Sequence, residues 1–207
     1  MNITEDHWLE GATRKTIPGG SPMNVRRFLV EHFTAGASAE SSIEFWRTPD
    51  AKGACAHVVI DRDGTIFQCR PFNRTCGHAG VSAWVDPNTG KRYEGLNSCS
   101  IGIEIANAGD SANSDGTAFS SHKFKMPAGA IRARHKNGGP ETYWEVYPEA
   151  QLKAVEEVSK ALVARYKLDD LVGHDDIAPA RKNDPGPAFP MTRIRLACGF
   201  TKPLAKL

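Results

Sequence analysis

A proline-rich stretch at residues 173–189, GHDDIAPARKNDPGPAF, carries three kinds of side chain that take part in catalysis. His174 supplies an imidazole, Lys182 an ammonium group and Asp184 a carboxylate. The prolines of this stretch each fix a backbone φ angle, so the loop can hold these groups in place. A single His followed by an Asp is a weak metal signal, because most such residues are surface or capping groups. A second imidazole from elsewhere in the chain would strengthen the metal interpretation.

His32 is a candidate for that second imidazole. It lies near the end of RFLVEHF, residues 27–33, a run of branched and aromatic residues that predicts a short strand. If His32 meets His174 and Asp184, three ligands leave a fourth position for water, as in catalytic zinc sites. Nitrogen and oxygen ligands also fit zinc better than calcium or magnesium. A half-buried structural histidine is the alternative for His32.

Glu104 is the candidate carboxylate for proton transfer. Period-two alternation in SIGIEIA, residues 100–106, places three isoleucines on one face of a predicted strand and Glu104 on the other. Gly102 and Ala106 flank Glu104 on that face, and their small side chains leave open space for a substrate in front of a general base. A solvated strand face would show the same pattern.

Two further histidines are candidate substrate contacts. His78 lies between glycines in CGHAGVS, where a ligand can approach the backbone closely and accept a hydrogen bond. His57 alternates with Val58 and Ile60 and would face a cleft if that side of the strand is open. The alternatives are an exposed loop residue for His78 and a satisfied structural histidine for His57.

The elements that must position these residues indicate an α/β fold with a mixed sheet covered by helices. Strands are predicted at 27–33, 56–60, 65–68 and 101–105, with the turn DRDG joining the middle two as a hairpin. Helices are predicted at 39–47, at 149–167 behind Pro148, and as a short segment within 188–198. Residues 1–22 are expected to form an extended lead-in, 71–98 a long connection and 142–147 an edge strand. Leu171 and Val172 lead into the loop that carries His174.

Residues 107–141 are poor in apolar side chains and are interpreted as an inserted loop. Its second half gathers basic side chains and histidines, namely His122, Lys123, Lys125, Arg132, Arg134, His135 and Lys136. This insertion is either a lid or rim that attracts an anionic polymer, or a solvated loop.

Length and composition predict one globular domain. The 207 residues are 40% hydrophobic and 24% charged, which is typical of a soluble domain, here with a core at about 25–197. A net charge of +2 gives no argument for nucleic-acid or membrane binding, and no nucleotide-binding glycine motif is present. The five cysteines include no C-x-x-C pair, so buried free thiols are expected. No secretory signal or membrane-length apolar run is found, which predicts a cytoplasmic protein, with a monomer favoured.

Five motifs in order resemble the zinc-dependent N-acetylmuramoyl-L-alanine amidases of the type-2 amidase family. They are EHFT around His32, AHVVIDRDG, HAGVS, SIGIEIAN and GHDDIAPARKNDPGPAF. The family includes peptidoglycan recognition proteins and amidase-type phage lysozymes. The resemblance covers about residues 25–197 and is greatest to the bacterial cytosolic amidases that recycle anhydro-muropeptides.

The resemblance implies one zinc ion per chain, held by His32, His174 and Asp184. It also implies catalytic roles for Glu104 and Lys182, and substrate contact for His78. Some members place a catalytic Tyr just before the histidine of the hairpin strand, where this chain has Ala56.

The implied reaction is hydrolysis of the amide between the lactyl group of N-acetylmuramic acid and L-alanine. The implied partners are peptidoglycan fragments or peptidoglycan itself. A recycling enzyme, a phage or prophage endolysin and a non-catalytic peptidoglycan-binding module remain open. The segment 107–141 is longer than in compact recycling enzymes, which leaves the size of the substrate open.

Overall fold

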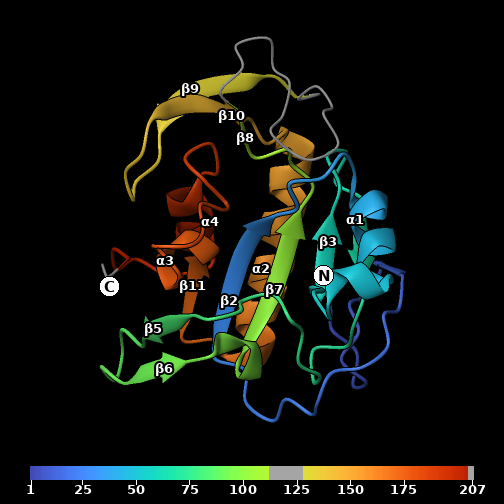
Figure 1. Ribbon diagram of the computed structural model, residues 1–207. Coiled ribbons are helices and arrows are strands. Elements are labelled where there is room, and N and C mark those ends of the chain that lie inside the picture. Colours follow the sequence, from blue (N-terminus) through green and yellow to red (C-terminus); the bar gives the residue numbers. More distant parts are fainter. Residues whose placement is uncertain (112–127, 205–207) are drawn as a thin grey trace.

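A six-stranded mixed sheet forms the centre of the computed structural model, which describes residues 1–111 and 128–204 (Figure 1). His122, Lys123 and Lys125 of the basic segment lie outside the described residues. The order of strands is β1-β4-β3-β7-β2-β11. Their bounds are Thr13–Arg14 (β1), Ile66–Gln68 (β4), Val58–Ile60 (β3), Ser100–Ile105 (β7), Phe28–Phe33 (β2) and Asp170–Gly173 (β11). Strands β3, β7, β2 and β11 run parallel, and β3 pairs antiparallel with β4, so the predicted mixed α/β fold is confirmed.

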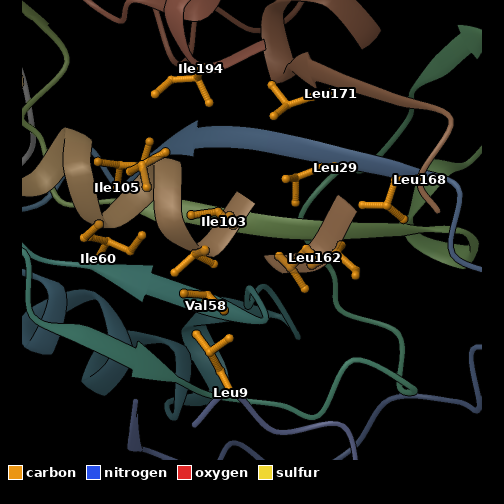
Figure 2. Close-up of a cluster of buried hydrophobic side chains, with 14 of the residues drawn as sticks. Leu9, Leu29, Val58, Ile60, Ile103, Ile105, Leu162, Leu168, Leu171 and Ile194 are labelled. Carbon is orange, nitrogen blue, oxygen red and sulfur yellow. The ribbon is translucent and has the colours of Figure 1, made fainter. Parts of the chain in front are cut away.

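Helix α2, Glu149–Tyr166, covers one face of this sheet and confirms the predicted packing helix. Alternate residues of the strands point toward it, including Leu29 of β2, Val58 of β3 and Ile103 of β7. Figure 2 shows these side chains gathered around Leu162 of α2. Each such fully buried aliphatic side chain stabilises the fold by about 1.5–3 kcal/mol. This apolar layer makes the sheet a rigid support for the groups on its other face.

The other face of the sheet carries two smaller apolar clusters. Helix α1, Ala39–Trp46, begins at the N-cap Ser38 and packs Ile43 in the cluster that contains Val59 of β3. The second cluster joins Val30 of β2 to Trp84 of β5, Ala83–Val85, which pairs with β6, Arg92–Glu94. The polar residues His32, His57 and Glu104 share this face by the same period-two alternation. The candidate site residues therefore lie on the face opposite α2.

The described part of the segment 107–141 contributes β8 and β9 to a separate three-stranded antiparallel sheet, in the order β8-β10-β9. The strands are Asp110–Ser111 (β8), Ala130–Arg134 (β9) and Glu141–Glu145 (β10). The predicted strand at 142–147 is confirmed at Glu141–Glu145, but its predicted place at an edge was wrong, because β10 has a partner on each side. Both partners come from the polar insertion, whose composition gave no strand signal. In Figure 1 this sheet lies beyond the carboxyl ends of β2 and β7.

Short elements complete the fold. Two 3-10 turns span Pro49–Ala51 and Leu96–Ser98, and two helices, α3 at His174–Ile177 and α4 at Met191–Ala197, follow β11. Strand β11 was not predicted, because a four-residue strand is recognisable only beside its partner β2. The five cysteines are free, and all except the half-buried Cys198 are buried, which confirms the expectation of buried thiols for four of them.

No helix in the described part of the chain is long and apolar enough to cross a membrane.

Candidate active site

Strand register brings three chemical groups into one row. His32 of β2 lies directly opposite Glu104 of the neighbouring strand β7. On the other side of β2, Gly173 of β11 pairs with Glu31, so that His174 follows at the level of His32. The carboxyl ends of parallel strands meet at one edge of a sheet, where open α/β sheets bind ligands. The row of His174, His32 and Glu104 therefore stands at the edge where a substrate is expected.

The three predicted metal ligands converge in a buried cluster. His32 Nδ1 lies 2.9 Å from His174 Nδ1, and each of these nitrogens lies 3.0 Å from Asp184 Oδ2. All three residues are buried and can each offer one ligand atom to an ion. Tetrahedral zinc with ligand bonds of 2.0–2.1 Å separates its ligands by about 3.3 Å. The spacing of the three atoms and their chemistry both fit zinc.

The surroundings also favour the protonation states that bind a metal. Burial, and then the neighbouring His174, lower the pKa of His32 to about 4, so its imidazole is neutral. Burial alone would raise the pKa of Asp184, but its close contacts with the His174 and His32 imidazoles outweigh burial and hold that pKa below its usual range. A neutral imidazole and an ionised carboxylate are the forms that ligate zinc.

Glu104 combines partial exposure with a carboxylate oxygen that is free to exchange a proton. Its Oε2 is buried and has no hydrogen-bond partner among the described residues. Burial, followed by the negative charge of Asp184, raises its pKa well above the usual value, and Lys182 opposes this shift. A carboxyl group with a raised pKa and a free oxygen is suited to general acid-base catalysis.

Lys182 lies half-buried in the loop after α3. It lines a cavity of about 450 Å³ between the β9–β10 hairpin and residues 179–183, together with Trp144 and Asn183. Within residues 1–111 and 128–204, no carboxylate forms an ion pair with its ammonium group. Its charge acts on the pKa of both Glu104 and His32, so it faces the same site.

His57 is fully enclosed and bonded to backbone on both sides of its ring. Its Nδ1 accepts a hydrogen bond from Gly102 N, at 3.1 Å, and its Nε2 donates to the carbonyl of Arg74, at 2.8 Å. The side chain is 0% exposed. This geometry favours the structural alternative for His57 over a substrate contact.

His78 stands behind His32, where it is buried. Its Nδ1 lies 3.0 Å from His32 Nε2, and its Nε2 lies 3.2 Å from the hydroxyl oxygen of Ser100. The sequence indicated open space next to Gly102, but the ring of His78 fills it: a Cβ on Gly102 would lie 2.5 Å from His78 Cγ. The small residue serves to seat an imidazole rather than to admit a substrate.

Asp175 is a site residue that sequence reasoning missed. It follows the ligand His174, and its backbone N donates to the carbonyl of Asp184, at 2.8 Å. Its carboxylate accepts from His135 Nε2, at 3.0 Å, and pairs with Lys136 Nζ at 2.9 Å. The only sequence signal was the doubled aspartate after His174. These bonds fasten the end of β9 to the metal-binding loop.

A second contact joins the segment 107–141 to the loop that carries Asp184, through the preceding residue Asn183. The side chain of Asn183 donates to Asp110 of β8, at 3.1 Å. Among the described basic residues of the insertion, Arg132 pairs with Glu141 and Lys136 pairs with two aspartates, so part of the positive charge is neutralised. The described part of this segment is thus docked on the site through Asp175 and Asn183, and Arg132 and Lys136 are paired with carboxylates of the protein.

Arg181, also missed from the sequence, joins two loops at the site. Its Nη2 donates to the carbonyl oxygens of Ala79 and Val81, both at 2.9 Å. The same Ala79 oxygen lies 3.2 Å from Nε2 of His174. The loop that follows His78 is therefore held against the ligand His174.

Two imidazoles and a carboxylate around one point, with a free carboxyl group beside them, form a candidate mononuclear metal site with the donor set of metal-dependent hydrolases. The fold that carries it is a mixed α/β sheet. The family model for N-acetylmuramoyl-L-alanine amidase of type 2 matches residues 21–187. The chain belongs to this family.

Curated relatives agree with this assignment. The chain is 33% identical over 145 residues to the 1,6-anhydro-N-acetylmuramyl-L-alanine amidase AmpD of Salmonella typhimurium (strain SL1344), covering 68% of this chain and 54% of that protein. It is 33% identical over 177 residues to the N-acetylmuramoyl-L-alanine amidase AmiD of Escherichia coli (strain K12), covering 81% and 51%. The chain thus spans about half the length of the curated relatives it matches.

Solved structures share the fold. A selenomethionine derivative of AmpD superposes with a TM-score of 0.62 at 27% identity, covering 95% of this chain and 99% of the other. AmpDh3 from Pseudomonas aeruginosa, in complex with anhydromuramic pentapeptide, superposes with a TM-score of 0.60 at 27% identity. The match covers 92% of this chain and 65% of AmpDh3. The amidase LysC from Clostridium intestinale URNW gives 0.59 at 19% identity, covering 92% and 99%, which shows a shared fold alone.

Proposed function

We propose that this protein is a zinc-dependent amidase that hydrolyses the bond between the lactyl group of N-acetylmuramic acid and L-alanine. The observation that carries the proposal is the convergence of His32 Nδ1, His174 Nδ1 and Asp184 Oδ2 within 3.0 Å of one another. Glu104 lies directly across the strand pair from His32, which places a proton-transfer group next to the metal ligands.

His32, His174 and Asp184 would hold the zinc ion, which would supply a water with a pKa lowered to about 7 and polarise the carbonyl of the scissile amide. The protein residues provide the rest of the chemistry. Glu104 takes the proton of the attacking water on its carboxylate and passes it to the departing alanine nitrogen. Lys182 places its ammonium charge near the oxyanion that develops on the carbonyl oxygen.

The preferred substrate class is soluble 1,6-anhydro-muropeptide. Support comes from the relatives, of which AmpD is named as a 1,6-anhydro-N-acetylmuramyl-L-alanine amidase and AmpDh3 was solved with anhydromuramic pentapeptide. The pairing of Arg132 and Lys136 with carboxylates also weakens the case that the insertion attracts an anionic wall polymer. Polymeric wall is the competing substrate.

Mass spectrometry of reaction products tests the proposal. Zinc-loaded protein is incubated in parallel with soluble anhydro-muropeptide and with intact sacculi, and Glu104→Gln serves as the inactive control. Release of free stem peptide from the soluble fragment supports the proposal, whereas release from sacculi makes the protein a wall-lytic amidase. If the protein binds stoichiometric zinc but cleaves neither substrate, the enzymatic function is refuted and a peptidoglycan-binding module is the remaining interpretation.

A further inference from the structure

A chain of hydrogen bonds leads from Ser100 to the metal ligand His32. The hydroxyl oxygen of Ser100 lies 2.6 Å from the carbonyl oxygen of Leu96. A carbonyl oxygen only accepts hydrogen bonds, so the single hydroxyl proton of Ser100 is donated to Leu96. Toward His78, whose Nε2 is 3.2 Å away, the Ser100 hydroxyl can then only accept. The proton of that hydrogen bond therefore belongs to Nε2 of His78.

The position of this proton fixes the next link. A neutral imidazole carries one N–H, so His78 with a proton on Nε2 has a lone pair on Nδ1. His32 Nε2 lies 3.0 Å from this lone pair and must be the donor. His32 is then unprotonated at Nδ1, which is the atom that lies 3.0 Å from Asp184 Oδ2.

The same reasoning applies to the second imidazole of the site. His174 Nε2 lies 3.2 Å from the carbonyl oxygen of Ala79, which can only accept. Arg181 Nη2 lies 3.4 Å from the same nitrogen, but its two protons are donated to the carbonyl oxygens of Ala79 and Val81, so the proton toward Ala79 is carried by His174 Nε2. The two Nδ1 lone pairs and the carboxylate oxygen of Asp184 therefore face one another without a proton between them. Such a set of converging lone pairs is suited to bind a cation.

We propose that His78 is a positioning residue, which selects the tautomer and the ring orientation of His32 so that its Nδ1 lone pair points at the metal. This inference rests on the zinc site of the proposed function. It assigns to His78 a role different from the substrate contact that the family resemblance implied. Groups that bond the remote nitrogen of a metal-binding histidine set its tautomer and strengthen its binding.

The seat of His78 is built to hold its ring in this orientation. Asn97 accepts hydrogen bonds from the backbone N–H groups of His78 and Ala79, at 3.1 and 2.7 Å. Gly102 provides the space that the ring occupies. The rings of His78 and His32 stand at 87° to each other, which lets the lone pair of one meet the N–H of the other. Only 7% of His78 is exposed, which leaves little surface for a substrate.

The test measures the zinc dissociation constant by competition with a chelator of known affinity. His78→Phe keeps a ring but removes both nitrogens, and we expect it to weaken zinc binding by about 10–100-fold. His78→Asn restores an acceptor for His32 Nε2 and should recover part of this loss. Gly102→Ala should weaken zinc binding as well, although Gly102 touches no ligand, because its Cβ displaces the His78 ring.

Nitrogen-15 NMR of the metal-free protein gives a readout independent of activity. Wild-type His32 should show the Nε2–H tautomer, and His78→Phe should shift it toward a mixture. The control is His7→Gln, which changes a half-buried histidine that contacts Tyr166, at 2.8 Å, away from His78 and its seat, and it should keep the wild-type zinc affinity.

Two results would overturn the inference in distinguishable ways. Unchanged zinc affinity and an unchanged His32 tautomer in His78→Phe, with a raised KM, would return His78 to substrate contact while the proposed function stands. Wild-type protein that binds no zinc would remove the proposed function and the positioning role together.

Discussion

At the scale of single residues, the proposed roles assign metal binding to one set of side chains and proton transfer and charge stabilisation to another. His32, His174 and Asp184 are buried and converge on one point. Glu104 and Lys182 are only half-buried and face the same point. This division means that a change at Lys182 can alter catalysis without removing the metal.

We expect Lys182→Ala to lower kcat at least about a hundredfold, because removing one donor to a developing oxyanion typically costs about 3 kcal/mol. Zinc content, measured by atomic absorption, should stay stoichiometric. Lys153→Ala on the exposed side of α2 is the matched control and should keep full activity. Equal turnover in the two variants would rule out the oxyanion role of Lys182.

His57 predicts a loss of stability in acid. Burial lowers the pKa of His57 from 6.5 to about 4. Between these two pH values the imidazole is protonated in the unfolded state and neutral in the folded state. The folded state is therefore destabilised as the pH falls from 6.5 toward 4, by about 3 kcal/mol in total.

Denaturant unfolding between pH 4 and 7 measures this dependence. His57→Gln cannot take up the proton, so its free energy of unfolding should fall less steeply with acid than that of the wild type. Parallel pH profiles for the two proteins would show that His57 does not titrate as its burial requires.

At the scale of elements, the junction of β11 and α3 decides where His174 lies. Gly173 is the last residue of β11, and its backbone N donates to the carboxylate of Asp176, at 2.8 Å. The contacts of Asp175 with the end of β9 fasten the same turn from outside. The ligand is thus held between a parallel strand pair and the inserted sheet.

Gly173→Ala should disturb this junction although the backbone of Gly173 is extended and unstrained. A Cβ there would lie 2.8 Å from Cδ of Pro185 and would also strike the Asp175 carboxylate. Overpacking of this kind costs about 1–3 kcal/mol. We expect a lower midpoint in thermal unfolding and weaker zinc binding in chelator competition.

Gly11→Ala is the control, because a Cβ at that position meets nothing within 4 Å. It should keep the zinc affinity of the wild type even if its positive φ angle costs some stability. A Gly173→Ala protein with wild-type zinc affinity would show that the turn adapts without moving His174.

At the scale of the whole molecule, the proposed metal site joins distant parts of the chain. One ligand comes from β2, and the others come from the turn and loop after β11, which lie beside it through parallel pairing. A ligand that binds only the folded state stabilises it, by about 2.7 kcal/mol at a hundred times its dissociation constant. Zinc should therefore act as a stabiliser of the fold as well as a cofactor.

Adding zinc to the metal-free protein at that excess should raise the midpoint of thermal unfolding by roughly 5–10 °C. A strong chelator should reverse the shift. His174→Ala loses one ligand and should show no shift with zinc. Stoichiometric zinc in purified His174→Ala would refute the ligand assignment.

The sequence by itself determined the kinds of groups and their local setting. The alternation in SIGIEIA placed Glu104 opposite the isoleucines, and the isoleucines do pack against α2. The strands at 27–33 and 101–105 and the helix at 149–167 followed from periodicity and terminal signals, which depend on near neighbours in the chain.

Only the tertiary structure decided which groups meet. The register that sets His32 against Glu104, and His174 beside His32, arises from pairing between strands far apart in the chain. No local pattern encodes that pairing, which also explains why β11 and the central position of β10 were missed. The place of His78 behind His32 has the same origin. The sequence shows that Gly102 leaves space beside it, but the residue that fills this space comes from a distant part of the chain.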